Sequence, residues 1–86
     1  MPVVSSFYGI IITMFWNEHN PPPFHVSYGE YKAILLINGY TLVQGWLPPR
    51  ALSLVIEWAT THHNELIENW NRALALQTIN KIEPLK

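Results

Sequence analysis

Two histidines and an arginine are the residues of this 86-residue chain whose types are best suited to chemistry. His19 and His25 flank three prolines, and imidazole can ligate a metal ion or transfer protons near neutral pH. Arg50 can hold a phosphate group through paired hydrogen bonds. One hypothesis is therefore a metal-independent ribonuclease. His19 and His25 would be its acid and base, Arg50 would bind phosphate, and Tyr28 or Tyr31 would contact the substrate.

The spacing of the two histidines argues against a metal site. The prolines between them favour an extended polyproline II segment of about 3.1 Å per residue, which holds the imidazole rings apart. Only Glu18 is nearby as a further ligand, whereas catalytic zinc takes three protein ligands. We expect no metal and no cofactor. In the plainer interpretation, His19 makes hydrogen bonds within the loop and His25 lies on the solvent face of a strand.

The remaining histidines and the tryptophans fit structural roles. His62 and His63 are adjacent in a predicted helix, so they point about 100° apart and are poorly placed to chelate one ion. Trp58 and Trp70 fall near the apolar stripe of that helix and are expected in the core. The ends of predicted strands hold two more indoles, Trp16 and Trp46, which become interface anchors if they are exposed.

The composition excludes several classes of protein. Hydrophobic residues make up 49% and charged residues 13% of the chain, against roughly 25% charged residues in a typical domain. Disorder is excluded because disordered chains combine low hydrophobicity with high net charge. With a net charge of -1, the chain lacks the cluster of basic residues that is typical of a nucleic-acid-binding protein.

The chain contains no cysteine, which excludes a disulfide framework, a thiolate metal site and a cysteine nucleophile. Residues 1–6 lack the basic start of a secretory signal. The longest apolar stretch, Phe7 to Trp16, is about half the length of a membrane helix. We expect one cytoplasmic domain over residues 1–86.

Four strands are predicted in the first half of the chain. The aromatic and β-branched run from Phe7 to Trp16 indicates a central strand covered on both faces, followed by the stiff proline loop. Alternation from Phe24 to Tyr28 indicates a half-buried strand. Asn38-Gly39 predicts a two-residue hairpin turn between strands at Tyr31–Ile37 and Tyr40–Trp46.

A two-residue turn fixes the register of that hairpin. The predicted cross-strand pairs are Ile37 with Tyr40, Leu35 with Leu42, Ala33 with Gln44, and Tyr31 near Trp46. The other face of the hairpin would then carry Lys32, Ile34, Leu36, Thr41, Val43 and Gly45. That face holds a second apolar strip, and we expect a subunit or partner to bind there through Ile34, Leu36 and Val43, with Trp46 beside them.

The second half of the chain is helical by its periodicity. Pro49 suits a first helical turn, and apolar residues then recur at helical spacing as far as Leu74. A polar stretch around His62 leaves two alternatives, one long helix or two with a bend near Asn64, which would cap the second. The tail from Gln77 is predicted to be extended. The fold class is α+β in the order β-β-β-β-α, with a four-stranded antiparallel sheet under one long or bent helix.

Several segments together resemble a small bacterial family catalogued as domain of unknown function 4160. They are Phe7-Tyr8-Gly9-Ile10, Asn17-Glu18-His19-Asn20-Pro21-Pro22, Phe24-His25, Tyr28-Gly29-Glu30-Tyr31, Leu47-Pro48, Glu68-Asn69-Trp70 and Ile82-Glu83-Pro84-Leu85. The proline-histidine loop is the most specific of them. The family loop has a further histidine where this chain has Pro23, so a three-histidine site is not expected here.

The resemblance implies a short cytoplasmic protein found beside another small protein, in an arrangement like a toxin-antitoxin pair. It implies no chemistry. Combined with the low charge and the apolar second sheet face, it favours a protein-interaction module that self-associates or pairs with a small neighbouring protein. The ribonuclease remains the alternative hypothesis.

Overall fold

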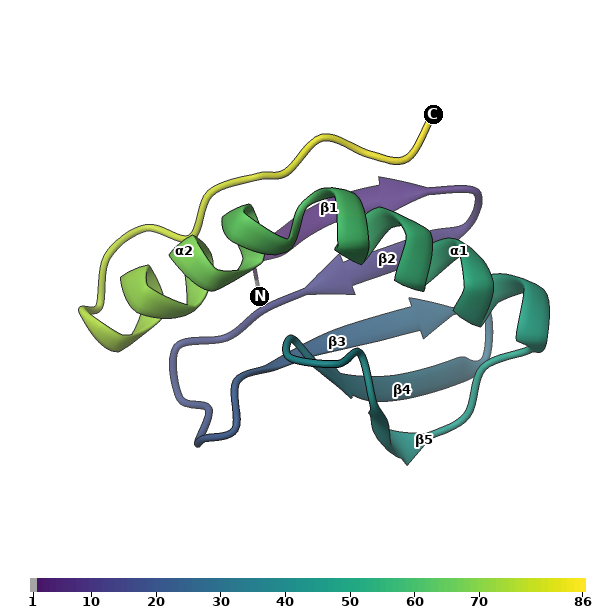
Figure 1. The fold of residues 1–86 in the computed structure, drawn as a ribbon, viewed down its shortest axis with the longest axis horizontal. Coiled ribbons are helices and arrows are strands. Elements are labelled where there is room, and N and C mark those ends of the chain that lie inside the picture. Colours follow the sequence, from purple (N-terminus) through teal and green to yellow (C-terminus); the bar gives the residue numbers. More distant parts are fainter. Residues whose placement is uncertain (1) are drawn as a thin grey trace.

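The computed structural model describes residues 2–86, which form one antiparallel sheet covered on one side by helices (Figure 1). The five strands lie in chain order, each bonded to the next. They are β1 (Val3–Phe7), β2 (Ile10–Thr13), β3 (Pro23–Tyr28), β4 (Tyr31–Leu36) and β5 (Leu42–Gly45). The helices α1 (Pro49–Thr61) and α2 (His63–Leu74) follow. The α+β class and the antiparallel sheet are as predicted.

The predicted number of four strands was wrong because the run from Phe7 to Trp16 contains a turn. Tyr8 and Gly9 both have positive φ values, +50° and +81°, which is the backbone of a tight hairpin turn. The turn reverses the chain, so that Phe7 pairs with Ile10 and Val3 with Thr13. β2 lies between β1 and β3, but it is not covered on both faces, because Ile11 is 40% exposed.

The hairpin of β4 and β5 has the predicted pair Leu35–Leu42, but its turn is longer than predicted. Positive φ occurs at Gly39 and Tyr40, and the Leu36 amide donates to the Thr41 carbonyl at 2.9 Å. A register shift then places Gln44 opposite Ile34, and Gly45 instead of Gln44 opposite Ala33. A β-bulge of this kind adds one residue to one strand.

The helical layer consists of two helices separated at a single residue. His62 has φ -111° and ψ 27° and lies between them, two residues before the bend expected near Asn64. Its side chain makes no capping hydrogen bond, and Asn64 is not the cap. Backbone hydrogen bonds continue across the break, from His62 to Trp58 and from Leu66 to His62, each 3.0 Å.

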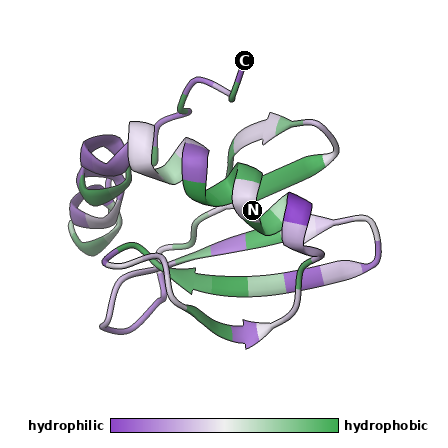
Figure 2. Cartoon of the chain, turned by 45° about the vertical axis from the view of Figure 1, so that its right-hand side comes forward, coloured by the Kyte–Doolittle hydropathy of each residue, from purple (hydrophilic) through white to green (hydrophobic). Residues whose placement is uncertain are grey.

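The core fills the space between the sheet and the helices. Trp58, Phe24, Ile12 and Leu35 are fully buried there, and Trp70 is 7% exposed, which confirms the core positions predicted for both helical tryptophans. Hydrophobic residues also run along the strands themselves (Figure 2).

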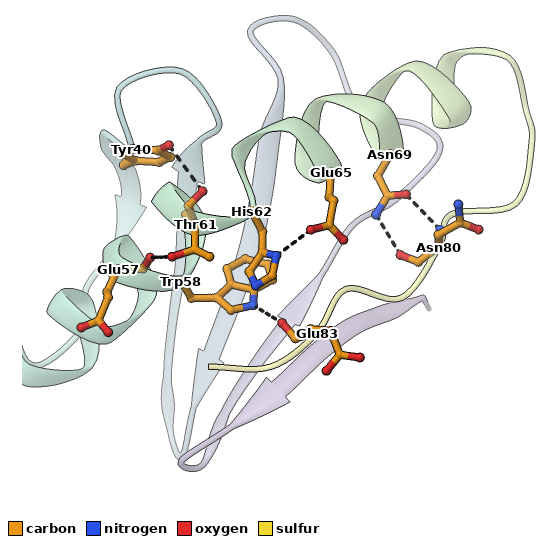
Figure 3. Close-up of polar contacts among 10 residues, drawn as sticks. Tyr40, Glu57, Trp58, Thr61, His62, Glu65, Asn69, Asn80 and Glu83 are labelled. Carbon is orange, nitrogen blue, oxygen red and sulfur yellow. Dashed lines mark hydrogen bonds and ion pairs between the residues drawn. The ribbon is translucent and has the colours of Figure 1, made fainter. Parts of the chain in front are cut away.

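The tail returns across the domain in extended form and is bonded to several elements. The Ile82 amide donates to the Val4 carbonyl at 2.8 Å, so the tail lies beside β1. From the helices, the Trp58 indole donates to the Glu83 carbonyl at 2.8 Å, and Asn69 bonds Asn80 (Figure 3). Ile79 and Ile82 are consequently buried. Within residues 2–86, neither helix has the length and hydrophobicity that crossing a membrane requires.

Candidate functional site

The face of the sheet that the helices do not cover carries a row of four side chains from four strands. Thr13 of β2 is opposite His25 of β3, His25 is opposite Ile34 of β4, and Ile34 is opposite Gln44 of β5. Side chains at directly opposed positions share a face. We call this surface the open face.

A neighbouring row on the open face adds a charge and more apolar surface. Ile11 is opposite Ser27, and Ser27 is opposite Lys32. Leu36, opposite Pro23, continues the face along β4. Among the strand positions of the open face, Lys32 is the one lysine, arginine, aspartate or glutamate within the described part of the chain.

His25 is held by a carboxylate from the loop that precedes its strand. Its Nε2 and Glu18 Oε1 are joined by a hydrogen bond, with side chains 27% and 26% exposed. The loop between β2 and β3, which contains a cis Asn20-Pro21 bond, returns Glu18 to the strand that follows. The Phe15 ring packs edge-on against the imidazole at 4.7 Å between centroids. The carboxylate fixes the orientation of the ring, and Phe15 shields one side of it.

These side chains border a groove of about 430 Å³. Its walls are formed by Thr13, Phe15, His25, Val26, Ser27, Lys32, Ala33, Ile34, Gln44 and Gly45, and we call it the open-face groove. A volume of this size with a few polar groups among apolar ones is typical of a binding site. It can receive a side chain that offers both apolar surface and a polar group.

The three residues of the ribonuclease hypothesis, His19, His25 and Arg50, do not lie together. His19 is exposed in the proline loop, and it makes no side-chain hydrogen bond to any residue in 2–86, contrary to the plainer interpretation of its role. Arg50, at the start of α1, lines a different pocket together with Tyr28. The structure therefore brings neither His19 nor Arg50 into the open-face groove with His25.

The two helical histidines have separate partners, as their divergence predicted. His62 Nδ1 bonds Glu65 Oε1 at 2.6 Å, and His63 Nδ1 bonds the Tyr40 hydroxyl at 3.0 Å. No group of three or more potential metal ligands occurs among residues 2–86.

The residues predicted to contact a partner lie on two adjoining parts of the sheet. Ile34 and Leu36 are half-buried on the open face. Val43 and Trp46 are 53% and 55% exposed at the β5 edge, where the Trp46 indole packs edge-on against Tyr31 at 5.2 Å. Tyr31 is in register with Tyr28 and the buried Ile10, so Trp46 packs at the helix-covered side of the sheet edge.

Sequence reasoning missed Glu18 as the partner of His25, and it paired Gln44 with Ala33 where the structure pairs it with Ile34. It did place Lys32 on the same face as Ile34. Glu18 is seven positions before His25 in sequence, and only the path of the loop brings them together.

The protein is thus a small α+β domain with an open sheet face and a histidine-carboxylate pair beside it. It belongs to the family described as domain of unknown function DUF4160, whose model matches residues 9–71. That range contains the proline loop, four of the five strands, α1 and most of α2. No curated protein and no solved structure matches the chain.

Proposed function

We propose that this protein is an interaction module that self-associates by packing the open face of one copy against that of another. The observation that carries the proposal is the apolar character of this uncovered face. Ile11, Ile34 and Leu36 occupy outward positions, which in a one-sided antiparallel sheet are normally polar. An uncovered face with this pattern is favourable to bury against another protein.

The charges on the open face favour a second copy as the occupant. A two-fold interface places the same patch on both sides, so the patch must complement itself. Lys32 supplies a positive charge, and the Glu18 carboxylate supplies a negative one beside His25. Lys32 has no acidic partner among residues 2–86. In a two-fold pair, each Lys32 is available to the Glu18 of the other copy.

The shape of the face is also compatible with sheet-on-sheet packing. Two stacked sheets lie about 10 Å apart with interdigitated side chains. The open-face groove beside Ile34 provides a recess for a side chain of the facing copy. Val43 and Trp46 add exposed apolar surface at the β5 edge.

The alternative to a second copy on this surface is a small protein from a neighbouring gene, as in a toxin-antitoxin-like pair. The same proposal places the module in the cytoplasm, where a chain without disulfides depends on packing alone. A ribonuclease receives no support from the positions of His19, His25 and Arg50, so we do not propose one.

Two substitutions on the open face test self-association by light scattering after size exclusion. Ile34→Asp puts an unpaired charge into the contact and is expected to give a monomer. Lys32→Glu, at an exposed position, is expected to weaken the dimer while leaving the fold intact. The matched control is Lys81→Glu, because Lys81 is exposed in the tail and outside the open-face groove.

The outcomes separate the occupants. A wild-type dimer that Lys32→Glu weakens and Lys81→Glu does not supports the proposal. A wild-type monomer contradicts self-association. This holds even if a neighbouring small protein is then found to bind the open face. Equal effects of Lys32→Glu and Lys81→Glu would place the contact elsewhere.

A further inference from the structure

A second pocket lies on the other side of the sheet and shares no residue with the open-face groove. It has a volume of about 310 Å³, close to the lower end of the range for small-molecule sites. It is bordered by the turn after β1, the end of β3, the first part of α1 and the end of the tail. Its residues are Tyr8, Tyr28, Arg50, Ala51, Leu54, Glu57, Leu85 and Lys86, and we call it the tyrosine pocket.

The tyrosine pocket is lined by three charged side chains, Arg50 and Glu57 of α1 and Lys86 of the tail. Arg50 and Lys86 form no ion pair with any acidic side chain in residues 2–86. Glu57 follows Arg50 by seven positions, which in a helix is the same face about 10 Å further along. Leu54 lies between them. The pocket therefore offers Arg50 and Glu57 at separate positions along α1 with Leu54 between them, and Lys86 is contributed by the tail.

The aromatic wall contains a residue of the β1–β2 turn whose backbone lies in the left-handed region. Tyr8 has φ +50°, a region that costs a non-glycine residue about 1 kcal/mol or more. Tyr40 has φ +53°, but its hydroxyl bonds His63 at 3.0 Å and so contributes to the fold. The Tyr8 side chain is 61% exposed and makes no hydrogen bond to the described residues. The tight turn sets this φ value, and the exposed Tyr8 ring is left as aromatic surface in the lining of the pocket.

We propose that the tyrosine pocket binds a nucleoside monophosphate whose base carries an exocyclic amine. Arg50 binds the phosphate through paired hydrogen bonds, with Lys86 as a second positive charge. The base stacks on the tyrosine wall, since aromatic side chains bind the π-face of any base. The exocyclic amine donates to the Glu57 carboxylate. This inference is independent of the self-association proposed above, because it concerns other residues on the other side of the sheet.

The combination of groups distinguishes this ligand from a simple anion. Inorganic phosphate would use Arg50 and Lys86 but leave the tyrosines without a role. A nucleoside without phosphate would use the tyrosines and Glu57 but leave both cations without one. A nucleotide has its phosphate at one end and its base at the other, and it engages both ends of the tyrosine pocket.

The test is calorimetric titration of the full chain with AMP, adenosine and inorganic phosphate as separate probes. We expect saturable one-to-one binding of AMP, with adenosine and phosphate weaker by roughly tenfold or more each. Arg50→Gln is expected to weaken AMP binding by roughly tenfold or more. Lys81→Gln removes one positive charge outside the tyrosine pocket and is expected to leave AMP binding unchanged.

A second variant addresses the aromatic wall without endangering the fold. Tyr8→Asn keeps a residue that tolerates positive φ, and it is expected to lose AMP affinity while circular dichroism remains that of the wild type. The proposal is overturned if AMP shows no saturable binding up to about 10 mM. It is also overturned if phosphate binds as well as AMP, if Lys81→Gln matches Arg50→Gln, or if Tyr8→Asn binds like the wild type.

Discussion

The side-chain amide of Asn69 makes two hydrogen bonds with the backbone of a single residue, Asn80. Its Nδ2 donates to the Asn80 carbonyl at 2.8 Å, and its Oδ1 accepts from the Asn80 amide at 2.9 Å. Asn69 is only 1% exposed (Figure 3). A buried polar side chain on α2 therefore holds the tail in place, together with the indole of Trp58.

Replacing Asn69 is expected to loosen the tail and destabilise the domain. Asn69→Ala removes both hydrogen bonds that hold Asn80, and because Asn80 is exposed and water replaces the lost partners, the cost is about 1–3 kcal/mol. Urea unfolding followed by tryptophan fluorescence measures the change. Asn71→Ala is the control, because Asn71 is exposed on the same helix, and it should change the unfolding free energy by less than about 0.5 kcal/mol. Equal losses in the two variants would contradict this role.

Gly45 is required by the close approach of β5 to β4. A Cβ built at Gly45 would lie 2.0 Å from the Lys32 carbonyl oxygen, and the residue has φ +81°. Gly45→Ala is expected to lower the unfolding free energy by more than about 3 kcal/mol. Gly29→Ala has positive φ but open space around the new methyl group, so it should cost only about 1–2 kcal/mol. Thermal melts compare the two, and a smaller loss for Gly45→Ala would show that the strands approach less closely.

The pair of Glu18 and His25 should couple measurably in stability. A double-mutant cycle with Glu18→Gln and His25→Gln is expected to give a coupling free energy of about 0.5–1.5 kcal/mol, since the pair is hydrogen-bonded and about three-quarters shielded. The comparison is the pair of His62 and Glu65, whose carboxylate side chain is 49% exposed. Its coupling should be smaller because solvent screens it. The interpretation fails if the coupling of Glu18 with His25 is absent.

Relief of backbone strain at Tyr8 should stabilise the protein. Tyr8→Asn places a residue that accepts positive φ in the turn, and it is expected to raise the unfolding free energy by about 0.5–1 kcal/mol. The gain is limited by loss of the edge-on contact between Tyr8 and Phe7, whose ring centroids are 6.5 Å apart. Differential scanning calorimetry measures it. A large loss of stability would mean that Tyr8 serves the fold.

Much of the sheet could be predicted from local sequence because alternation and turn residues are local signals. The strand of Phe24 to Tyr28, the pair Leu35–Leu42 and the helix beginning at Pro49 all follow from such patterns. Tyr8-Gly9 was not read as a turn, since tyrosine is rare at positive φ. The β1 strand was lost with it, because Val3–Phe7 lies before that turn.

The site was predictable in its parts but not in its arrangement. The outward positions of Ile34 and Leu36 follow from the period of a strand. The bulge that brings Gln44 opposite Ile34 depends on the close contact of Gly45 with Lys32, which no local pattern encodes. The approach of Glu18 to His25 likewise depends on the folded path of the proline loop. Arg50 and His25 were grouped by residue type, and the sheet separates them.

Sedimentation equilibrium of the wild-type chain tests the central claim of self-association most directly. The chain mass is 10.0 kDa, and the account predicts a concentration-dependent mass that approaches twice this value. The increase should be lost in Ile34→Asp and retained in Lys81→Glu. A wild-type mass that stays at 10.0 kDa at every concentration would contradict the account.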